Sequence, residues 1–119
     1  MNVVVICVAG GVGSLTRFIV DGLVRSRLGR RFPWGTIVIN MSGALLLGVI
    51  TALATKQDVS ASQKLVIGTG FCGGYTTFST ASFEAVRLLE EKRVGAALLH
   101  VVANIGLTVG AATLALLVV

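Results

Sequence analysis

The chain has 119 residues, of which 55% are hydrophobic and 13% charged, and its formal net charge is +5. Four apolar segments, each close to the roughly 20 residues that a membrane-spanning helix needs, take up nearly all of it. This pattern predicts a single all-α membrane domain over residues 1–119 in the cell membrane, with no room for a soluble catalytic domain, so the chain is not expected to be an enzyme. The ten Lys and Arg residues lie mostly between the apolar segments, which does not suit nucleic acid binding.

The first predicted helix covers about residues 2–24. Because no basic residues precede its apolar run, it is expected to be a membrane helix rather than a signal peptide. Gly10, Gly11 and Gly13 are small residues of the kind that let membrane helices approach closely. Arg17 lies far inside this apolar segment, where a charge costs about 2.5 kcal/mol or more unless it finds a partner. Two interpretations stay open: Arg17 pairs with Asp21, four residues on, or it draws anions into a vestibule.

The second predicted helix, about residues 33–55, follows an arginine-rich connection. It begins with Pro33, which suits a helix start, and with the interfacial aromatic residue Trp34. Asn40 lies about 9 Å along the helix axis from Trp34 at 1.5 Å per residue, which is membrane depth. The Asn40 amide therefore needs a partner. It either joins two helices by a simple hydrogen bond or lines a polar path.

The third predicted helix, about residues 62–89, is interrupted by the stretch 68–80. This stretch places four glycines, four threonines, one serine and three aromatic rings in thirteen positions. Each glycine weakens a helix by roughly 1 kcal/mol relative to alanine, so the backbone can leave the helix here. At membrane depth such a break is tolerated only where protein buries it or a polar cavity borders it, which predicts a site for something small and charged. Further on, Glu84 is expected to pair with Arg87 rather than to carry protons.

The fourth predicted helix, about residues 94–119, has its polar side chains at one spacing. His100, Asn104 and Thr108 follow one another in steps of four, which places all three on one face of a helix. Inside lipid, a stripe of three hydrogen-bonding side chains favours a polar path, and helix association is the alternative.

Basic residues are distributed unequally between the two ends of the predicted bundle. If four helices span the membrane, seven basic residues lie on the side of the first and third connections and two on the other side: Arg25, Arg27, Arg30, Arg31, Arg87, Lys92 and Arg93, against Lys56 and Lys64. Basic connections remain in the cytoplasm. The bias predicts one fixed orientation with both termini outside the cytoplasm.

Three motifs lie along the chain at the places described above. They are Gly10-Gly11-x-Gly13-x-x-x-Arg17, Gly35-Thr36-x-x-x-Asn40-x-x-Gly43 and Gly70-Phe71-Cys72-Gly73-Gly74-Tyr75-Thr76-Thr77-Phe78-Ser79-Thr80. Together they resemble the CrcB/Fluc fluoride channels over essentially the whole chain. The resemblance implies subunits of four transmembrane helices with a broken third helix. It also implies that two such subunits assemble as an antiparallel dimer with two pores, which exports fluoride passively and lowers fluoride toxicity in the cytoplasm.

The same resemblance implies which residues form the sites. A structural Na⁺ ion on the two-fold axis would be held by the main-chain carbonyls of Gly73 and Thr76. The fluoride path would be lined by one phenylalanine and a track of polar side chains: Asn40, Phe78, Ser79, Thr80, His100, Asn104 and Thr108. Arg17 is the candidate for the vestibule. Fluoride gives up water reluctantly, so close donors such as amides and hydroxyls, helped by the positive edge of a phenyl ring, must replace its hydration shell.

Two positions depart from the family pattern. Many members have a second phenylalanine three residues after the first, where this chain has Ala81, and tyrosine is common at the position of His100. An antiparallel homodimer also needs a chain that inserts both ways, whereas the charge bias favours one way. Two partners therefore stay open: a second copy of this chain, or an oppositely oriented paralogue that supplies the missing pore groups. Whether Ala81 silences one pore is open as well.

The alternative function is that of a small four-helix proton-coupled multidrug exporter. That mechanism needs a carboxylate deep in the membrane, commonly in the first helix. The first predicted helix offers Arg17 and a near-interface Asp21 instead. A scaffold protein without transport gives no reason for the broken third helix.

Overall fold

The computed structural model describes residues 3–119, which are helical throughout apart from short connections and contain no strand. Three helices are long and apolar enough to cross a membrane: α1 (Val3–Leu28), α2 (Trp34–Thr55) and α6 (Val94–Val118). The third predicted segment is divided into α3 (Ala61–Lys64), the π-helical η1 (Leu65–Cys72), α4 (Gly73–Tyr75) and α5 (Ser79–Glu90). The all-α prediction is confirmed. The count of four spans stays a prediction, because each piece of the third segment is shorter than a span.

The first helix ends later than predicted, at Leu28 rather than near residue 24. Arg25 and Arg27 lie in its last turn, where positive charge interacts favourably with the helix dipole. Gly29 then adopts a φ of +84°, and its N–H donates to the Arg25 carbonyl oxygen over 2.9 Å. A glycine in the left-handed region is a common helix terminator, so the end of α1 is decided by Gly29 rather than by the first arginine.

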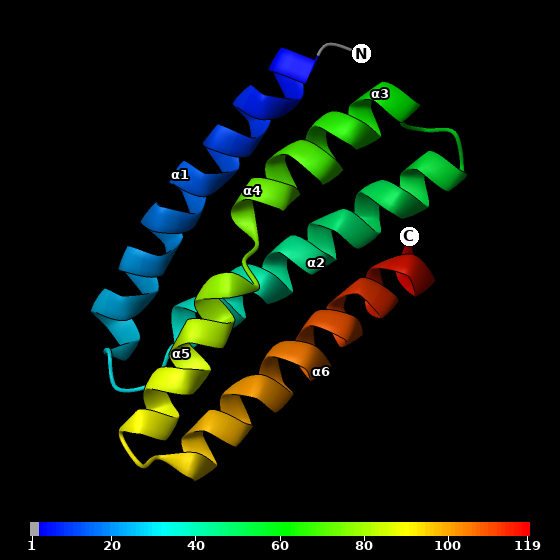
Figure 1. The fold of residues 1–119 in the computed structure, drawn as a ribbon. Helices are drawn as coiled ribbons and strands as arrows, with labels where there is room; N and C mark the ends of the chain where they lie inside the picture. Colours follow the sequence, from blue (N-terminus) through cyan, green and yellow to red (C-terminus); the bar gives the residue numbers. More distant parts are fainter. Residues whose placement is uncertain (1–2) are drawn as a thin grey trace.

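The helices form a bundle in which α2 lies between two groups of neighbours (Figure 1). On one side α2 packs along α6, and on the other side η1 and α4 separate it from most of α1. The two basic connections, after α1 and after α5, lie at the same end of the bundle (Figure 1). The α2–α3 connection and the start of the described part of α1 lie at the opposite end.

Small residues bring α1 against the broken segment. A side chain at Gly13 would overlap the Phe71 carbonyl oxygen and approach the Tyr75 nitrogen to 2.9 Å, and one at Gly74 would overlap the Gly10 carbonyl. The Ser14 hydroxyl also donates to the Gly74 carbonyl oxygen over 3.2 Å. The close approach predicted from the glycines of the first helix is therefore confirmed for Gly10 and Gly13, which place backbone directly against backbone beside the break. A side chain at Gly11 would meet nothing within 4 Å among residues 3–119.

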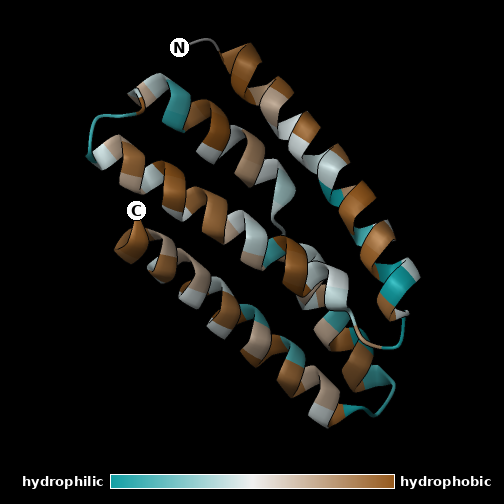
Figure 2. Ribbon diagram, turned by 180° about the vertical axis from the view of Figure 1, so that it is seen from behind, coloured by the Kyte–Doolittle hydropathy of each residue, from teal (hydrophilic) through white to brown (hydrophobic). Residues whose placement is uncertain are grey.

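Most exposed surface is apolar along the long helices. Phe18 on α1 is 77% exposed and Leu117 on α6 is 80% exposed. Hydrophobic residues cover most of the helix walls, and hydrophilic ones lie at the connections and also in bands along the helix that ends at the C-terminus (Figure 2). This distribution suits helices whose outer faces meet lipid or another subunit, so the cell-membrane prediction is consistent with the fold.

Candidate functional site

The break lies at residues 76–78, between α4 and α5. The helix stops where Thr76 turns to an extended conformation with ψ of 159°, while its N–H and hydroxyl both donate to the Cys72 carbonyl oxygen over 2.9 and 2.8 Å. Thr77 is buried, and its hydroxyl oxygen accepts the Thr80 N–H over 3.1 Å. That bond satisfies one of the free donors at the start of α5.

Asn40 of α2 replaces the backbone hydrogen bonds that the break removes. Its Oδ1 accepts the Thr77 N–H over 2.9 Å, and its Nδ2 donates to the Thr77 carbonyl oxygen over 3.0 Å. In a continuous helix the Thr77 N–H would bond to the carbonyl of Gly73, four residues earlier. The Asn40 amide therefore holds the break open and deprives the Gly73 carbonyl of its helical donor.

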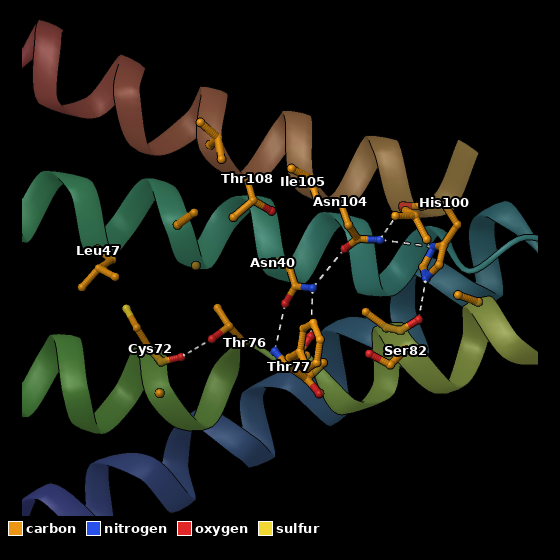
Figure 3. Close-up of a pocket in the computed structure, with 18 of the residues that line it drawn as sticks. Asn40, Leu47, Cys72, Thr76, Thr77, Ser82, His100, Asn104, Ile105 and Thr108 are labelled. Carbon is orange, nitrogen blue, oxygen red and sulfur yellow. Dashed lines mark hydrogen bonds between the residues drawn. The ribbon is translucent and has the colours of Figure 1, made fainter. Parts of the chain in front are cut away.

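The polar residues of α6 continue this hydrogen-bonded chain (Figure 3). Asn40 Nδ2 donates to Asn104 Oδ1 over 3.0 Å, and Asn104 Nδ2 lies 3.2 Å from His100 Nδ1. His100 Nε2 in turn lies 3.1 Å from the Ala81 carbonyl oxygen on α5. This hydrogen-bonded chain thus joins α2, α6, the break and α5. Asn40 joins two helices, as one of its two interpretations holds, and its contact with Thr77 was not predicted.

The predicted Glu84–Arg87 ion pair is wrong, and so is one of the two open interpretations of Arg17. Asp21 pairs with Arg25 rather than with Arg17. Arg25 is likewise four residues from Asp21, but on its C-terminal side, in the turn that the longer α1 adds. Arg87 forms its ion pair with Glu91, at 3.6 Å from Nε to Oε2, rather than with Glu84.

Glu84 faces the bundle interior. It accepts a hydrogen bond from the Thr36 hydroxyl, and its Oε1 lies 3.9 Å from His100 Nε2. The His100 ring also meets the Phe32 ring edge to face, at 5.9 Å between centroids. Glu84 therefore belongs to an inner polar cluster rather than to a surface ion pair.

A cleft of about 800 Å³ runs between α2, α6 and the broken segment. Seven of the predicted site residues line it: Asn40, Gly73, Thr76, Phe78, His100, Asn104 and Thr108. The rest of the lining is largely apolar, with Leu47, Ile105 and Val109 among it. Thr77 also lines the cleft. We did not predict a role for Thr77, although a threonine just before a helix start is a recognisable capping signal.

Three predicted residues lie outside this cleft. Ser79 and Thr80 are exposed in the first turn of α5, and Arg17 lies on α1. Arg17 is also absent from the smaller hollow of about 200 Å³ at the basic end, which Asp21 and Arg25 line. Phe78 reaches the cleft but is 86% exposed, so most of its ring faces outward from this single chain.

Comparison with known proteins gives matches over almost the whole chain. Residues 4–116 match the family described as "CrcB-like protein, Camphor Resistance (CrcB)". A protein of Leifsonia xyli named "Fluoride-specific ion channel FluC 1" is 47% identical over 114 residues, which are 96% of this chain and 83% of that protein. "Fluoride-specific ion channel FluC 2" of Mycolicibacterium paratuberculosis is 47% identical over 100 residues, covering 84% of this chain and 79% of its own length. "Fluoride-specific ion channel FluC" of Syntrophotalea carbinolica is 41% identical over 110 residues, with coverages of 92% and 89%.

Proposed function

The chain belongs to the CrcB-like family, and from that membership we propose that it is a subunit of a fluoride-selective channel in the cell membrane. The observation that carries the proposal is the match along nearly the full chain to relatives named as fluoride-specific ion channels. The channel lets fluoride leave the cell passively and so lowers fluoride toxicity in the cytoplasm. The chain acts as a channel and not as an enzyme.

The proposed fluoride path follows the cleft past the break. The hydroxyl of Thr108 lies on its wall, and the hydroxyls of Ser79 and Thr80 follow directly after the break. Both amide hydrogens of Asn40 are donated within the protein, so a fluoride ion receives one of them only by displacing an oxygen of Thr77 or Asn104. The hydroxyls and the Phe78 ring edge are therefore the readily available donors, and Asn40 acts chiefly by holding the break.

A second subunit completes the site in this proposal. Phe78 is 86% exposed beside the break, and Gly73 is exposed with open space where a side chain would be. A Na⁺ ion favours oxygen ligands, and the Gly73 and Thr76 carbonyls of one chain supply only part of its coordination. The donors fit a structural Na⁺ shared with the same carbonyls of an antiparallel partner. That partner is a second copy or an oppositely oriented paralogue.

The test is fluoride efflux from liposomes that contain this purified chain alone, followed with a fluoride electrode, with chloride efflux as the selectivity control. Fluoride-selective efflux is expected. Asn40→Ala is expected to reduce it, because the backbone N–H and carbonyl of Thr77 lose their hydrogen bonds to the Asn40 amide. Thr55→Ala is the matched control in the same helix, because the Thr55 hydroxyl is exposed and, within residues 3–119, donates to the Thr51 carbonyl oxygen alone.

If this chain alone conducts no fluoride, the proposal still allows that the channel is a heteromer. Co-reconstitution with an oppositely oriented paralogue then restores efflux if the channel is a heteromer. If neither the chain alone nor the pair conducts fluoride, or if chloride passes equally well, the proposed function is wrong.

A further inference from the structure

We propose that His100 is a positioning residue of the ion path. Held as the neutral tautomer with hydrogen on Nε2, it sets the orientation of the Asn104 and Asn40 amides and thereby the geometry of the break at Thr77. The inference rests on the proposed function for its transport test and on hydrogen bonding alone for its structural test. The His100 side chain has no exposed surface, although it lies at one end of the cleft, so no solvent replaces a lost hydrogen bond.

The tautomer follows from the two partners of the imidazole ring. Nε2 lies 3.1 Å from the Ala81 carbonyl oxygen, which can only accept, so Nε2 carries the hydrogen. Nδ1 lies 3.2 Å from Asn104 Nδ2, which can only donate, so Nδ1 is bare. The Ala81 contact requires a hydrogen on Nε2, which the neutral Nε2–H tautomer and the charged ring both have, and the Asn104 contact requires a bare Nδ1, which only the neutral tautomer offers.

The orientation of Asn104 is fixed from two sides. Besides facing the ring, its Nδ2 donates to the main-chain carbonyl oxygen of His100 over 2.9 Å. Both hydrogens of Nδ2 are thus used, and Oδ1 is left to accept from Asn40 over 3.0 Å. Because the bare Nδ1 of the ring faces Asn104 Nδ2, Asn104 turns its Oδ1, an acceptor, toward Asn40.

Asn40 transmits this orientation to the break. One hydrogen of its Nδ2 goes to Asn104, the other goes to the Thr77 carbonyl oxygen, and its Oδ1 accepts the Thr77 N–H. Turning the amide over would put its NH₂ group against the Thr77 N–H. The Asn40 orientation that satisfies both backbone groups of Thr77 is thus the one that needs an acceptor at Asn104.

A proton added to Nδ1 reverses the pattern. Asn104 would have to turn its oxygen toward the ring, which places its NH₂ group against the NH₂ group of Asn40. Either the Asn40–Asn104 bond is lost, or Asn40 turns and releases Thr77. Protonation of Nδ1 is therefore expected to loosen the break and reduce conduction.

Few charged groups lie around the His100 ring. Among residues 3–119, Glu84 of α5 faces the ring, with its Oε1 3.9 Å from Nε2, and Asp21 and Arg87 interact electrostatically with Glu84. The connection before α2 contributes the uncharged Phe32 ring. Neither α2 nor the rest of α6 contains a charged side chain.

The structural test is nitrogen NMR of the histidine ring in lipid. The chain has a single histidine, so the signals need no assignment. The expected spectrum at about pH 8 has a protonated Nε2 and a bare Nδ1, and on acidification toward about pH 5 any protonation of the ring is expected to shift the side-chain amide signals of Asn40 and Asn104 with it. The opposite tautomer, or amide signals that ignore the protonation of the ring, overturns the proposal whether or not the chain conducts fluoride.

The transport test compares two variants with the natural chain over the same pH range. His100→Phe keeps the volume of the ring but makes no hydrogen bonds, and His100→Gln keeps a donor and an acceptor that do not titrate. Where acid protonates the ring, as the NMR spectrum reports, we expect efflux of the natural chain to fall roughly tenfold, the size of one buried hydrogen bond. The Phe variant is expected to be low at every pH, and the Gln variant active with a flat profile.

Protein-free liposomes at each pH correct for hydrogen fluoride that crosses the lipid unaided. A Phe variant equal to the natural chain, or a Gln variant with the same pH profile as the natural chain, would show that His100 only packs. If the Phe variant fails to fold, the Gln variant and the NMR spectrum still decide. If the natural chain conducts no fluoride at any pH, the proposed function fails and the spectrum alone decides the role of His100.

Discussion

Replacing Gly13 by alanine tests whether α1 is held against the broken segment by backbone contact. The added methyl group would overlap the Phe71 carbonyl oxygen and lie 2.9 Å from the Tyr75 nitrogen. Both contacts are backbone atoms, so relief requires α1 to move away from η1 and α4. Overpacking of this kind costs about 1–3 kcal/mol, and we expect the free energy of unfolding to fall by that amount relative to the control.

Gly11→Ala is the matched control, two residues earlier in the same helix. A side chain there meets nothing within 4 Å in this chain. Both substitutions gain the same helix propensity of about 1 kcal/mol, so the difference between them isolates the contact. The assay is titration of the purified protein from mild detergent into SDS, followed by the fluorescence of the single tryptophan, Trp34. Equal unfolding free energies for the two variants would refute the close approach of α1 to the break.

Two further predictions concern the break and the inner carboxylate. Thr77→Val removes the oxygen that accepts the Thr80 N–H. Loss of such a cap is expected to cost about 1 kcal/mol of unfolding free energy in the same SDS titration, whereas Thr77→Ser, which keeps the hydroxyl, should cost less; equal losses would argue against capping. Glu84→Gln retains an oxygen that can accept from the Thr36 hydroxyl. Fluoride efflux from liposomes is expected to persist in this variant, which would exclude a mechanism that requires the Glu84 carboxylate, and its abolition would contradict this prediction.

The spacing of polar and small residues predicted the main features of the site. The dense glycine and threonine stretch indicated where the third segment breaks, and the structure has non-helical residues there, at 76–78. The four-residue spacing of His100, Asn104 and Thr108 placed them on one face, and all three line one cleft. Both predictions succeeded because helix geometry relates sequence spacing directly to position on one helix.

Predictions about pairs of charges were less successful. Asp21 has an arginine four residues away on either side, so spacing alone does not choose between Arg17 and Arg25. Glu84 and Arg87 have a suitable spacing, yet Glu84 turns toward Thr36 and His100. The partner of Asp21 is an arginine in a turn that was not predicted to be helical. The partners of Glu84 are distant from it in the sequence.

The amino-acid sequence by itself determined the all-helical membrane character, the position of the break and the alignment of the polar stripe, because these depend on composition and on periodicity within one segment. Only the tertiary structure decided what the stripe contacts. Asn40 meets Thr77 and Asn104 at sequence separations of 37 and 64 residues. Such contacts depend on which helix faces come together, and that is set by how closely glycine-containing surfaces pack and by where each buried polar group finds its partner.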